Sequence, residues 1–422
     1  MLVWDEMHAY NAVHVARVPV ALDAERLRGV LARVLEARGL TGLRMDAKKR
    51  GFEFRGGAAL IELIVLDGGA DTREVLHAEM ARQINVRFEH SGEFTPFRFF
   101  AVPDGDSFWL GTVYFHAIAD AEPIVRLVCE FVADCANAGV PVKREPWDCH
   151  RETGGGNAWR PAHWLRKLRK LFAFPAQFRG MRTAIRPGGT DGDDFGNDVE
   201  IFTLGSAELG TLIAAGKKFG VTVNDLFLAL LMHSLLPLCE AARRPGRDRI
   251  SLGCIVNARR DLGIADDGSF GLVLGGFSVT CGITEAAGIP QLARSIAGQT
   301  RRFKRGAFYL MNEMEMRFVL RLMSLFSTNQ RRRFYPKNYP LWGGLTNMNL
   351  TKLPVEAAAV PPSDYLRTVS TGPVTPLALS VTTFGKGVNL TMSYRTSVFS
   401  QPEISAVRER FAAALRGLEA AV

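Results

Sequence analysis

The alternation of apolar and polar residues predicts a strand and then a helix near the start of the chain. The run "NAVHVARVPV" from residue 11 alternates between apolar and polar residues, which is typical of a strand with one buried face. The following segment predicts a helix with one apolar face, formed by Leu27, Val30, Leu31, Val34 and Leu35. Strand and helix patterns go on mixing up to about residue 150. We therefore expect an α/β or α+β arrangement here.

The second half repeats this mixture around one very apolar helix. The run "LFLALLMHSLLPL" from Leu226 to Leu238 is apolar on nearly every side, so it predicts a helix buried in a core. At about 13 residues, it is shorter than the roughly 20 that cross a bilayer. Three later segments predict strands, namely "LWGGLTNMNL", "LALSVTTFG" and "VNLTMSYR". An amphipathic helix is expected at the C-terminus.

The length of 422 residues predicts two domains, because one ordinary core does not grow to this size. We expect a first lobe at residues 1–150 and a second lobe at residues 197–422. Residues 151–196 begin and end with glycine-rich turns and predict a basic connection between the lobes. The expected fold class is therefore α/β with α+β character, in two lobes.

Positive charge is concentrated in this predicted connection. The chain has a net charge of +9, and the stretch 153–190 contains eight cations and no acidic residue. Within it, "PAHWLRKLRKLFAF" predicts a helix with an apolar face formed by Trp164, Leu168, Leu171 and Phe172. Such a helix is typical of a membrane surface, but a helix that docks the lobes is the alternative. The charge fits an anionic partner: a membrane, an acidic carrier protein, a phosphorylated cofactor or nucleic acid.

The cysteine and histidine spacings predict neither a zinc nor a redox site. Six cysteines occur without a C-x-x-C pair, and eight histidines occur without an H-E-x-x-H motif. We expect free thiols and no metal. The start "MLVWDEMHAYNAVHVARV" lacks the basic and apolar regions of a secretory signal, which predicts a cytoplasmic location. Peripheral contact with the inner membrane surface through the basic segment 159–186 is the alternative.

The segment "WLGTVYFHAIADAEPIV" places a histidine and an aspartate where a predicted strand gives way to a predicted helix. Because a strand has a period of two, His116 shares a face with Thr112 and Tyr114 at the end of that strand. An imidazole in this position can be held in one tautomer and accept a proton near neutral pH. Asp120 has a purely structural interpretation, because aspartate is a favoured cap for the N-terminus of a helix.

The spacing from His116 to Asp120 resembles the H-x-x-x-D motif of the condensation-domain and BAHD superfamily of acyltransferases, which share a fold with chloramphenicol acetyltransferase. The segments "VTVNDLFLALLMHSL", "LGCIVNARRDLG" and "GGLTNMNLTKL" follow in the order and at roughly the intervals of that superfamily. The "ND" pair and "TPFRFF" are most similar to free-standing wax ester synthase-like and alcohol acyltransferase-like members. Phe115 and Ala121 depart from the paired histidines and the glycine of many members, and the D-F-G-W-G motif of plant members is absent.

The resemblance implies both a fold and a reaction. The implied fold has two chloramphenicol acetyltransferase-like lobes, each a mixed β-sheet flanked by helices, with an active-site tunnel between them. His116 is implied as the general base that activates a hydroxyl or amine for direct attack on a thioester. The implied donor is acyl-CoA or an acyl carrier protein, and the acceptor is a small molecule or a lipid. No tightly bound cofactor is implied, because coenzyme A or phosphopantetheine arrives as part of the donor.

Four further residues are candidates for this site. The resemblance implies that Asp120 is architectural and pairs with Arg259, while Arg260 is the less favoured partner. Thr346 or Asn347 is our candidate for stabilising the oxyanion or positioning the substrate, because a tetrahedral intermediate needs a hydrogen-bond donor. Ordinary hydrogen bonding within a strand is the alternative for these two residues.

Two other functions are compatible with parts of the sequence. A catalytically silent member of the same fold would bind a carrier protein or a lipid without turnover, although His116 and Asp120 argue against it. A nucleic-acid-binding protein would use the basic stretch 153–190 together with "RRFKR" at 301–305 and "RRR" at 331–333. No recognised RNA- or DNA-binding motif accompanies these charges, so no nucleic acid is expected as a partner.

Overall fold

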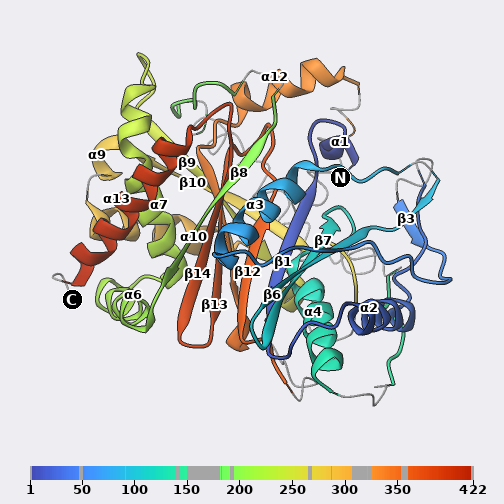
Figure 1. Cartoon of the computed structure of the whole chain (residues 1–422). Coiled ribbons are helices and arrows are strands. Elements are labelled where there is room, and N and C mark those ends of the chain that lie inside the picture. The colour runs from blue at the N-terminus through green and yellow to red at the C-terminus, as the bar shows by residue number, and fades with distance from the viewer. Residues whose placement is uncertain are drawn as a thin grey trace.

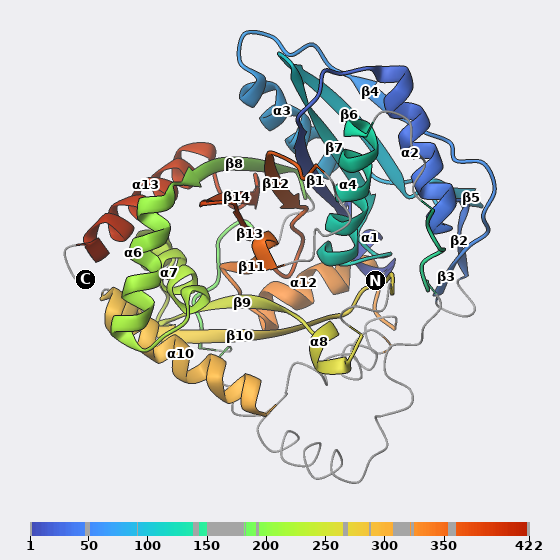
Figure 2. The same cartoon turned by 90° about the horizontal axis from the view of Figure 1, so that it is seen from below.

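The structure is a computed structural model in which two sheets carry helices on their faces (Figures 1 and 2). It describes residues 2–46, 51–90, 92–137, 143–149, 181, 183–190, 194–264, 269–286, 288–306, 321, 325–352 and 360–419. The predicted basic helix around Trp164 and most of the predicted connection 151–196 lie outside the described residues.

The sheet that carries the candidate base has five strands. Their order is β12 (Asp364–Val369), β1 (Asn11–Val18), β7 (Ser107–Phe115), β6 (Phe97–Asp104) and β4 (Leu63–Val65). Neighbouring strands are antiparallel except for β4 and β6. The covering helices are α3 (Thr72–Asn85) on one face and, on the other, α2 (Ala24–Arg38) and α4 (Ala121–Ala136), as Figure 2 shows. A smaller sheet contains β3 (Gly51–Phe54), β2 (Leu43–Asp46) and β5 (Glu93–Phe94).

Local sequence signals explain several of these elements. The predicted first strand and the helix after it are confirmed as β1 and α2. The side chain of Asp23 caps α2, and the helix ends at Gly39, whose φ of 69° lies in the left-handed region that favours glycine. Gly111 of β7 lies opposite Phe100 of β6, and a Cβ at this glycine would overlap the phenylalanine ring.

The second sheet has six strands and its own helical cover. The strand order is β10 (Leu274–Gly282), β9 (Arg249–Asn257), β11 (Gly343–Asn349), β13 (Leu377–Phe384), β14 (Gly387–Arg395) and β8 (Asn197–Leu204). β11 is parallel to both β9 and β13, and the other pairs are antiparallel. The covering helices are α6 (Ser206–Phe219), α7 (Val223–Ala241), α10 (Ile289–Arg305) and α13 (Gln401–Glu419). Shorter elements are α1 (Leu2–Asp5), α8 (Arg259–Leu262), α9 (Ile283–Ala286), α12 (Thr328–Asn338) and the 3₁₀ turn η2 (Leu350–Lys352).

The central apolar helix of the second lobe is confirmed as α7. It starts after Thr222, whose side chain accepts from the backbone N–H of Asp225, while the carboxylate of Asp225 accepts from the N–H of Thr222. α10 and α13 pack against it. α7 has 19 residues, more than the apolar run alone, so by length and composition it is sufficient to cross a bilayer, yet more than half of its apolar stretch is buried inside the protein. In this structure it is therefore a core helix.

One strand crosses from the second half of the chain to the first sheet. β12 falls within residues 197–422, but it pairs with β1 along the edge of the five-stranded sheet. It also packs against β13 and β14 of the six-stranded sheet (Figure 1). The division at residues 150 and 197 stays a prediction, while β12 physically connects the two sheets.

Candidate active site

His116 follows β7 directly and is held by contacts to two backbone carbonyls. Its N–H donates to the carbonyl of Tyr10 at 2.9 Å, which ties the end of β7 to the segment before β1. Its ring Nδ1 lies 3.0 Å from the carbonyl oxygen of Ala119. Because a carbonyl oxygen only accepts hydrogen bonds, Nδ1 carries the proton and Nε2 presents its lone pair. The imidazole is thus oriented to act as a base through Nε2.

Two tyrosines flank the imidazole of His116. The ring of Tyr10 stacks on it with centroids 5.1 Å apart, and the ring of Tyr114 meets it edge-on at 5.6 Å. His116 itself keeps partial exposure to solvent. The ring is therefore held in position from two sides. The period of the strand predicts Tyr114 on this face, whereas no sequence pattern points to Tyr10, which precedes the first strand.

The environment of His116 favours its uncharged form. Burial lowers the pKa of His116 to about 4, although the hydrogen bond to Ala119 opposes this shift, and the nearby positive charge of Arg367 lowers the pKa further. Loss of water and a neighbouring cation both disfavour an imidazolium. At neutral pH the ring is uncharged, so its Nε2 is available to accept a proton.

Asp120 caps a helix and also forms an ion pair. Its Oδ1 accepts from the N–H of Glu122 at 3.1 Å, so it caps α4. Its Oδ2 lies 3.0 Å from Nη2 of Arg259 and accepts from the N–H of Val273 at 2.8 Å. Asp120 is 1% exposed and Arg259 is 3% exposed, so this ion pair is buried. Its carboxylate binds the first half of the chain to the second.

The structure selects between the two neighbouring arginines. Arg259 begins α8, is buried, and also donates to the carbonyls of Ser269 at 2.9 Å and Gly271 at 2.7 Å. Arg260 is exposed to solvent. A buried carboxylate needs a buried partner, which explains why Arg259 and not Arg260 meets Asp120.

Thr346 and Asn347 lie side by side on β11, away from any direct bond to the candidate base. Thr346 is half-buried and Asn347 is exposed. They occupy register positions opposite Ser380 and Val381 of β13. Within the described residues, no hydrogen bond joins either side chain to His116. Their role as oxyanion or substrate-positioning groups stays a prediction.

One buried cation near this site, Arg367 of β12, was not among the predicted site residues. The strand "DYLRTV" shows an arginine between apolar residues, which was the available signal. Arg367 is 4% exposed, and its Nη2 lies 3.5 Å from the carbonyl oxygen of Thr346. It therefore joins the five-stranded sheet to the strand that carries Thr346 and Asn347.

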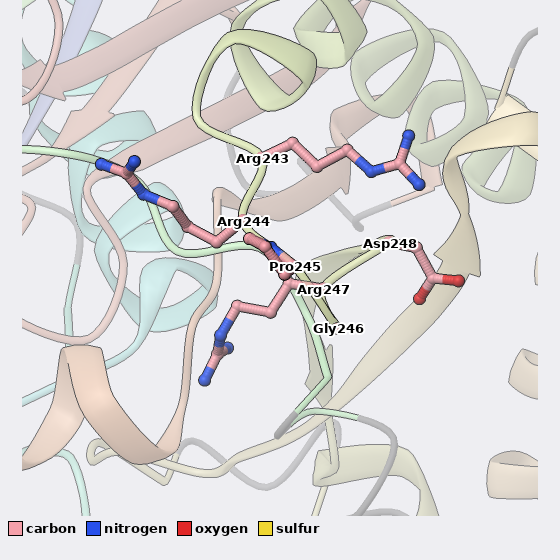
Figure 3. Close-up of a pocket in the computed structure, with 6 residues that line it drawn as sticks. All are labelled: Arg243, Arg244, Pro245, Gly246, Arg247 and Asp248. Carbon is pink, nitrogen blue, oxygen red and sulfur yellow. The ribbon is translucent and has the colours of Figure 1, made fainter.

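A surface hollow of about 380 Å³ lies elsewhere, in the loop between α7 and β9 (Figure 3). Its lining consists of Arg243, Arg244, Pro245, Gly246, Arg247 and Asp248. None of the predicted site residues contributes to it. Among the described residues, no group of three His, Cys, Asp or Glu side chains gathers as a metal site would require.

Neither family models nor curated sequences match this chain. No protein-family model matches it, and no curated protein matches it at a significant level. Only solved structures therefore place it among known proteins.

The fold is that of the two-lobed condensation domains, which confirms the expected fold of two mixed sheets flanked by helices. The first condensation domain of the calcium-dependent antibiotic synthetase, in complex with a substrate analogue, matches with a TM-score of 0.70 and 15% identity, over 99% of this chain and 94% of that chain. The EpoB cyclization-docking bidomain from Sorangium cellulosum matches at 0.67 and 14%, over 97% and 79%. The epimerization domain from the third module of tyrocidine synthetase B matches at 0.58 and 14%, over 98% and 92%.

Proposed function

We propose that this protein is an acyltransferase that moves an acyl group from a thioester to a hydroxyl or amine acceptor, with His116 as the general base. The observation that supports the proposal is the geometry of His116, whose Nδ1 lies 3.0 Å from the carbonyl oxygen of Ala119, so that Nε2 keeps its lone pair. The similar structures are named as condensation, cyclization and epimerization domains, which supports chemistry on acyl or peptidyl groups.

The proposed reaction proceeds by direct transfer. The acceptor oxygen or nitrogen attacks the thioester carbonyl while its proton passes to Nε2 of His116, and the π electrons of the carbonyl move to its oxygen. The tetrahedral intermediate then collapses, the C–S bond breaks, and the departing thiolate takes the proton from His116. Burial raises the pKa of all six cysteine thiols above their usual value, which disfavours a thiolate nucleophile on the enzyme.

In this proposal the remaining site residues hold His116 in place and stabilise the charge of the oxyanion. The Asp120–Arg259 pair fixes the loop between β7 and α4, and with it the place of His116. Thr346 or Asn347 would donate a hydrogen bond to the oxyanion or to the substrate. The passage between the lobes would keep water from a thioester that lies beside a base.

The donor and partners are part of the same proposal. The donor would be an acyl carrier protein or acyl-CoA, and phosphopantetheine or coenzyme A would enter as part of it. The acceptor would be a small molecule or a lipid, as in wax ester synthase-like or alcohol acyltransferase-like members. Exposed arginines such as Arg243 and Arg244 would suit an acidic carrier protein or the phosphates of coenzyme A. The location would be cytoplasmic, and peripheral membrane contact through residues 159–186 is the alternative.

A thiol-release assay tests the proposed function. The protein is incubated with a panel of acyl thioesters and candidate alcohols or amines, and the free thiol is followed in the wild type and in His116→Ala. We expect acceptor-dependent thiol release that the variant loses. Equal release by both proteins would leave His116 without a role. Binding of acyl carrier protein or lipid with no release at all would favour the catalytically silent alternative.

A further inference from the structure

Tyr10 contacts the candidate base with both its backbone and its side chain. Its carbonyl accepts the backbone N–H of His116 at 2.9 Å, which fixes the point where the chain leaves β7. Its ring stacks on the imidazole, with centroids 5.1 Å apart and an angle of 27° between the planes. Tyr114, the second flanking tyrosine, meets the imidazole edge-on at 82°. A flat face of the imidazole therefore lies against Tyr10.

The ring of Tyr10 and the carbonyl of Ala119 restrict the imidazole in different ways. Rotation about the Cβ–Cγ bond of a histidine is broad and roughly two-fold, so one hydrogen bond alone holds the ring loosely. The stacked tyrosine fixes the plane of the imidazole, because turning that plane would push its edge into the tyrosine ring. The contact of Nδ1 with the Ala119 carbonyl, at 3.0 Å, selects which edge of the imidazole faces that carbonyl. Together they place the proton on Nδ1 and the lone pair on Nε2.

A buried carboxylate anchors the backbone of Tyr10. The N–H of Tyr10 donates to Oδ1 of Asp5 at 3.3 Å, and Oδ2 of Asp5 lies 2.9 Å from Nε2 of His90. Asp5 is 3% exposed, and its own carbonyl accepts from Nη1 of Arg87. Tyr10 lies just before β1 and outside any helix or strand, so its position depends on these contacts.

A second histidine supports the ring of Tyr10. His8 is almost completely buried and meets the tyrosine ring edge-on, with centroids 5.9 Å apart. A Cβ at Gly372, in the loop after β12, would overlap the ring of His8, so this loop comes close to it. The rings of His8, Tyr10 and His116 are therefore in contact one after another, and the second half of the chain supports the first of them.

We propose that Tyr10 is a positioning residue of the acyl-transfer site, which holds the imidazole of His116 in the plane where Nδ1 meets Ala119 and Nε2 keeps its lone pair. This inference rests on the proposed function. Tyr10 acts through His116 and not by contact with the substrate. Because an oriented base is already in place when the acceptor arrives, loss of the stacked ring should lower kcat and leave KM nearly unchanged.

The tautomer of His116 tests this role without any substrate. In protein labelled with ¹⁵N in histidine, the shifts of the two ring nitrogens at neutral pH report which nitrogen carries the proton, and His116→Gln assigns the signals. We expect the Nδ1–H form in the wild type and in Tyr10→Phe, which keeps the ring. In Tyr10→Leu, which removes the stacked face, the Nε2–H form should appear beside it. An unchanged tautomer in folded Tyr10→Leu overturns the proposal, and so does an Nε2–H form in the wild type.

Tyr339→Leu is the matched control for general loosening of the N-terminal segment. Tyr339 is also a half-buried tyrosine and packs against Met7, but no ring contact joins it to His116 within the described residues. The tautomer of His116 should stay that of the wild type. An Nε2–H form in Tyr339→Leu would show that the segment and not the ring of Tyr10 orients the base, which overturns the proposal. Tyr10→Met takes the place of Tyr10→Leu if that variant does not fold.

Kinetics then separate this inference from the proposed function. In active protein, we expect Tyr10→Leu to lower kcat roughly 10- to 100-fold, because misplacing a catalytic group can cost that much. Tyr10→Phe should keep kcat close to the wild type. An equal loss in Tyr10→Phe would mean that the hydroxyl acts in the reaction, which overturns the positioning role. The expected tautomers without thioester consumption would contradict the function and leave the orienting effect of Tyr10 standing. His116-dependent acyl transfer with a tautomer that ignores Tyr10 would do the reverse.

Discussion

Two buried arginines near the junction of the lobes, Arg259 and Arg367, have opposite surroundings. Arg259 meets a carboxylate, because its Nη2 lies 3.0 Å from Oδ2 of Asp120. Arg367 meets backbone carbonyls and the hydroxyl of Thr382, with no carboxylate among the described residues. Both side chains are almost completely buried. Similar burial is therefore combined with a balanced charge in one place and an unbalanced charge in the other.

This difference shows that a buried arginine can either hold another residue in place or change the pKa values of its neighbours. The balanced pair holds Asp120, which caps α4 and fixes the loop that carries His116. The unbalanced cation changes the electrical potential at neighbouring titratable groups, which shifts their pKa values. His116 is four residues from Asp120, and two ring contacts through Tyr114 connect it to His14, the cross-strand neighbour of Arg367.

Removing the base should have the largest effect. We expect His116→Ala to lower kcat/KM for acyl transfer by about 10²- to 10⁴-fold, because proton transfer by a positioned base contributes that much. Thioester turnover measured by thiol release checks this. His233→Ala is the matched control, since its Nδ1 also lies near a carbonyl, 2.8 Å from that of Ala286, on the remote helix α7. Comparable losses in both variants would contradict the assignment.

Breaking the balanced pair from one side should destabilise the fold. We expect Asp120→Ala to lower the free energy of unfolding by about 3 to 5 kcal/mol, because it leaves a buried guanidinium unpaired and removes a helix cap. Urea denaturation measures the change. The double variant Asp120→Ala with Arg259→Met should lose less than the sum of the single losses. The exposed Arg260→Met should change stability by no more than about 0.5 kcal/mol.

The depressed histidine pKa values predict a pH-dependent stability. The pKa values of His116 and His8 are lowered from 6.5 to about 4 in the folded protein. Between these values the unfolded state binds more protons, so stability falls as the pH decreases through this window. Each histidine contributes at most about 1.4 kcal/mol per pH unit. Urea denaturation at several pH values in this window should show that the free energy of unfolding depends less on pH in His116→Ala than in the wild type. The same pH dependence in both proteins would contradict the effect of burial on the pKa of His116.

Removing one hydrogen-bond acceptor of Arg367 should have the smallest effect on stability. We expect Thr382→Val to lower the free energy of unfolding by about 1 kcal/mol, because one hydrogen bond of Arg367 loses its acceptor while the backbone acceptors remain. The check is again urea denaturation, and acyl transfer should change little. A loss as large as that of Asp120→Ala would show that the two arginines depend on their partners to the same degree.

Local elements of this protein follow from the sequence by itself. The alternation in residues 11–18 predicts β1, the apolar face of residues 24–38 predicts α2, and the apolar run 226–238 predicts α7. The spacing of His116 and Asp120 at the end of a strand also comes from neighbouring residues alone. The reason is physical: periodicity, caps and turns depend on contacts within a few residues, so the local sequence contains them.

Tertiary structure alone decided what these residues meet. The partner of Asp120 is 139 positions away, and the choice of Arg259 over Arg260 depended on which guanidinium became buried. The pairing of β12 with β1 brought Arg367, from the second half of the chain, into the five-stranded sheet. Burial lowered the pKa of His116. No local pattern contains these facts, because long-range pairing and removal of water exist only after the chain has packed.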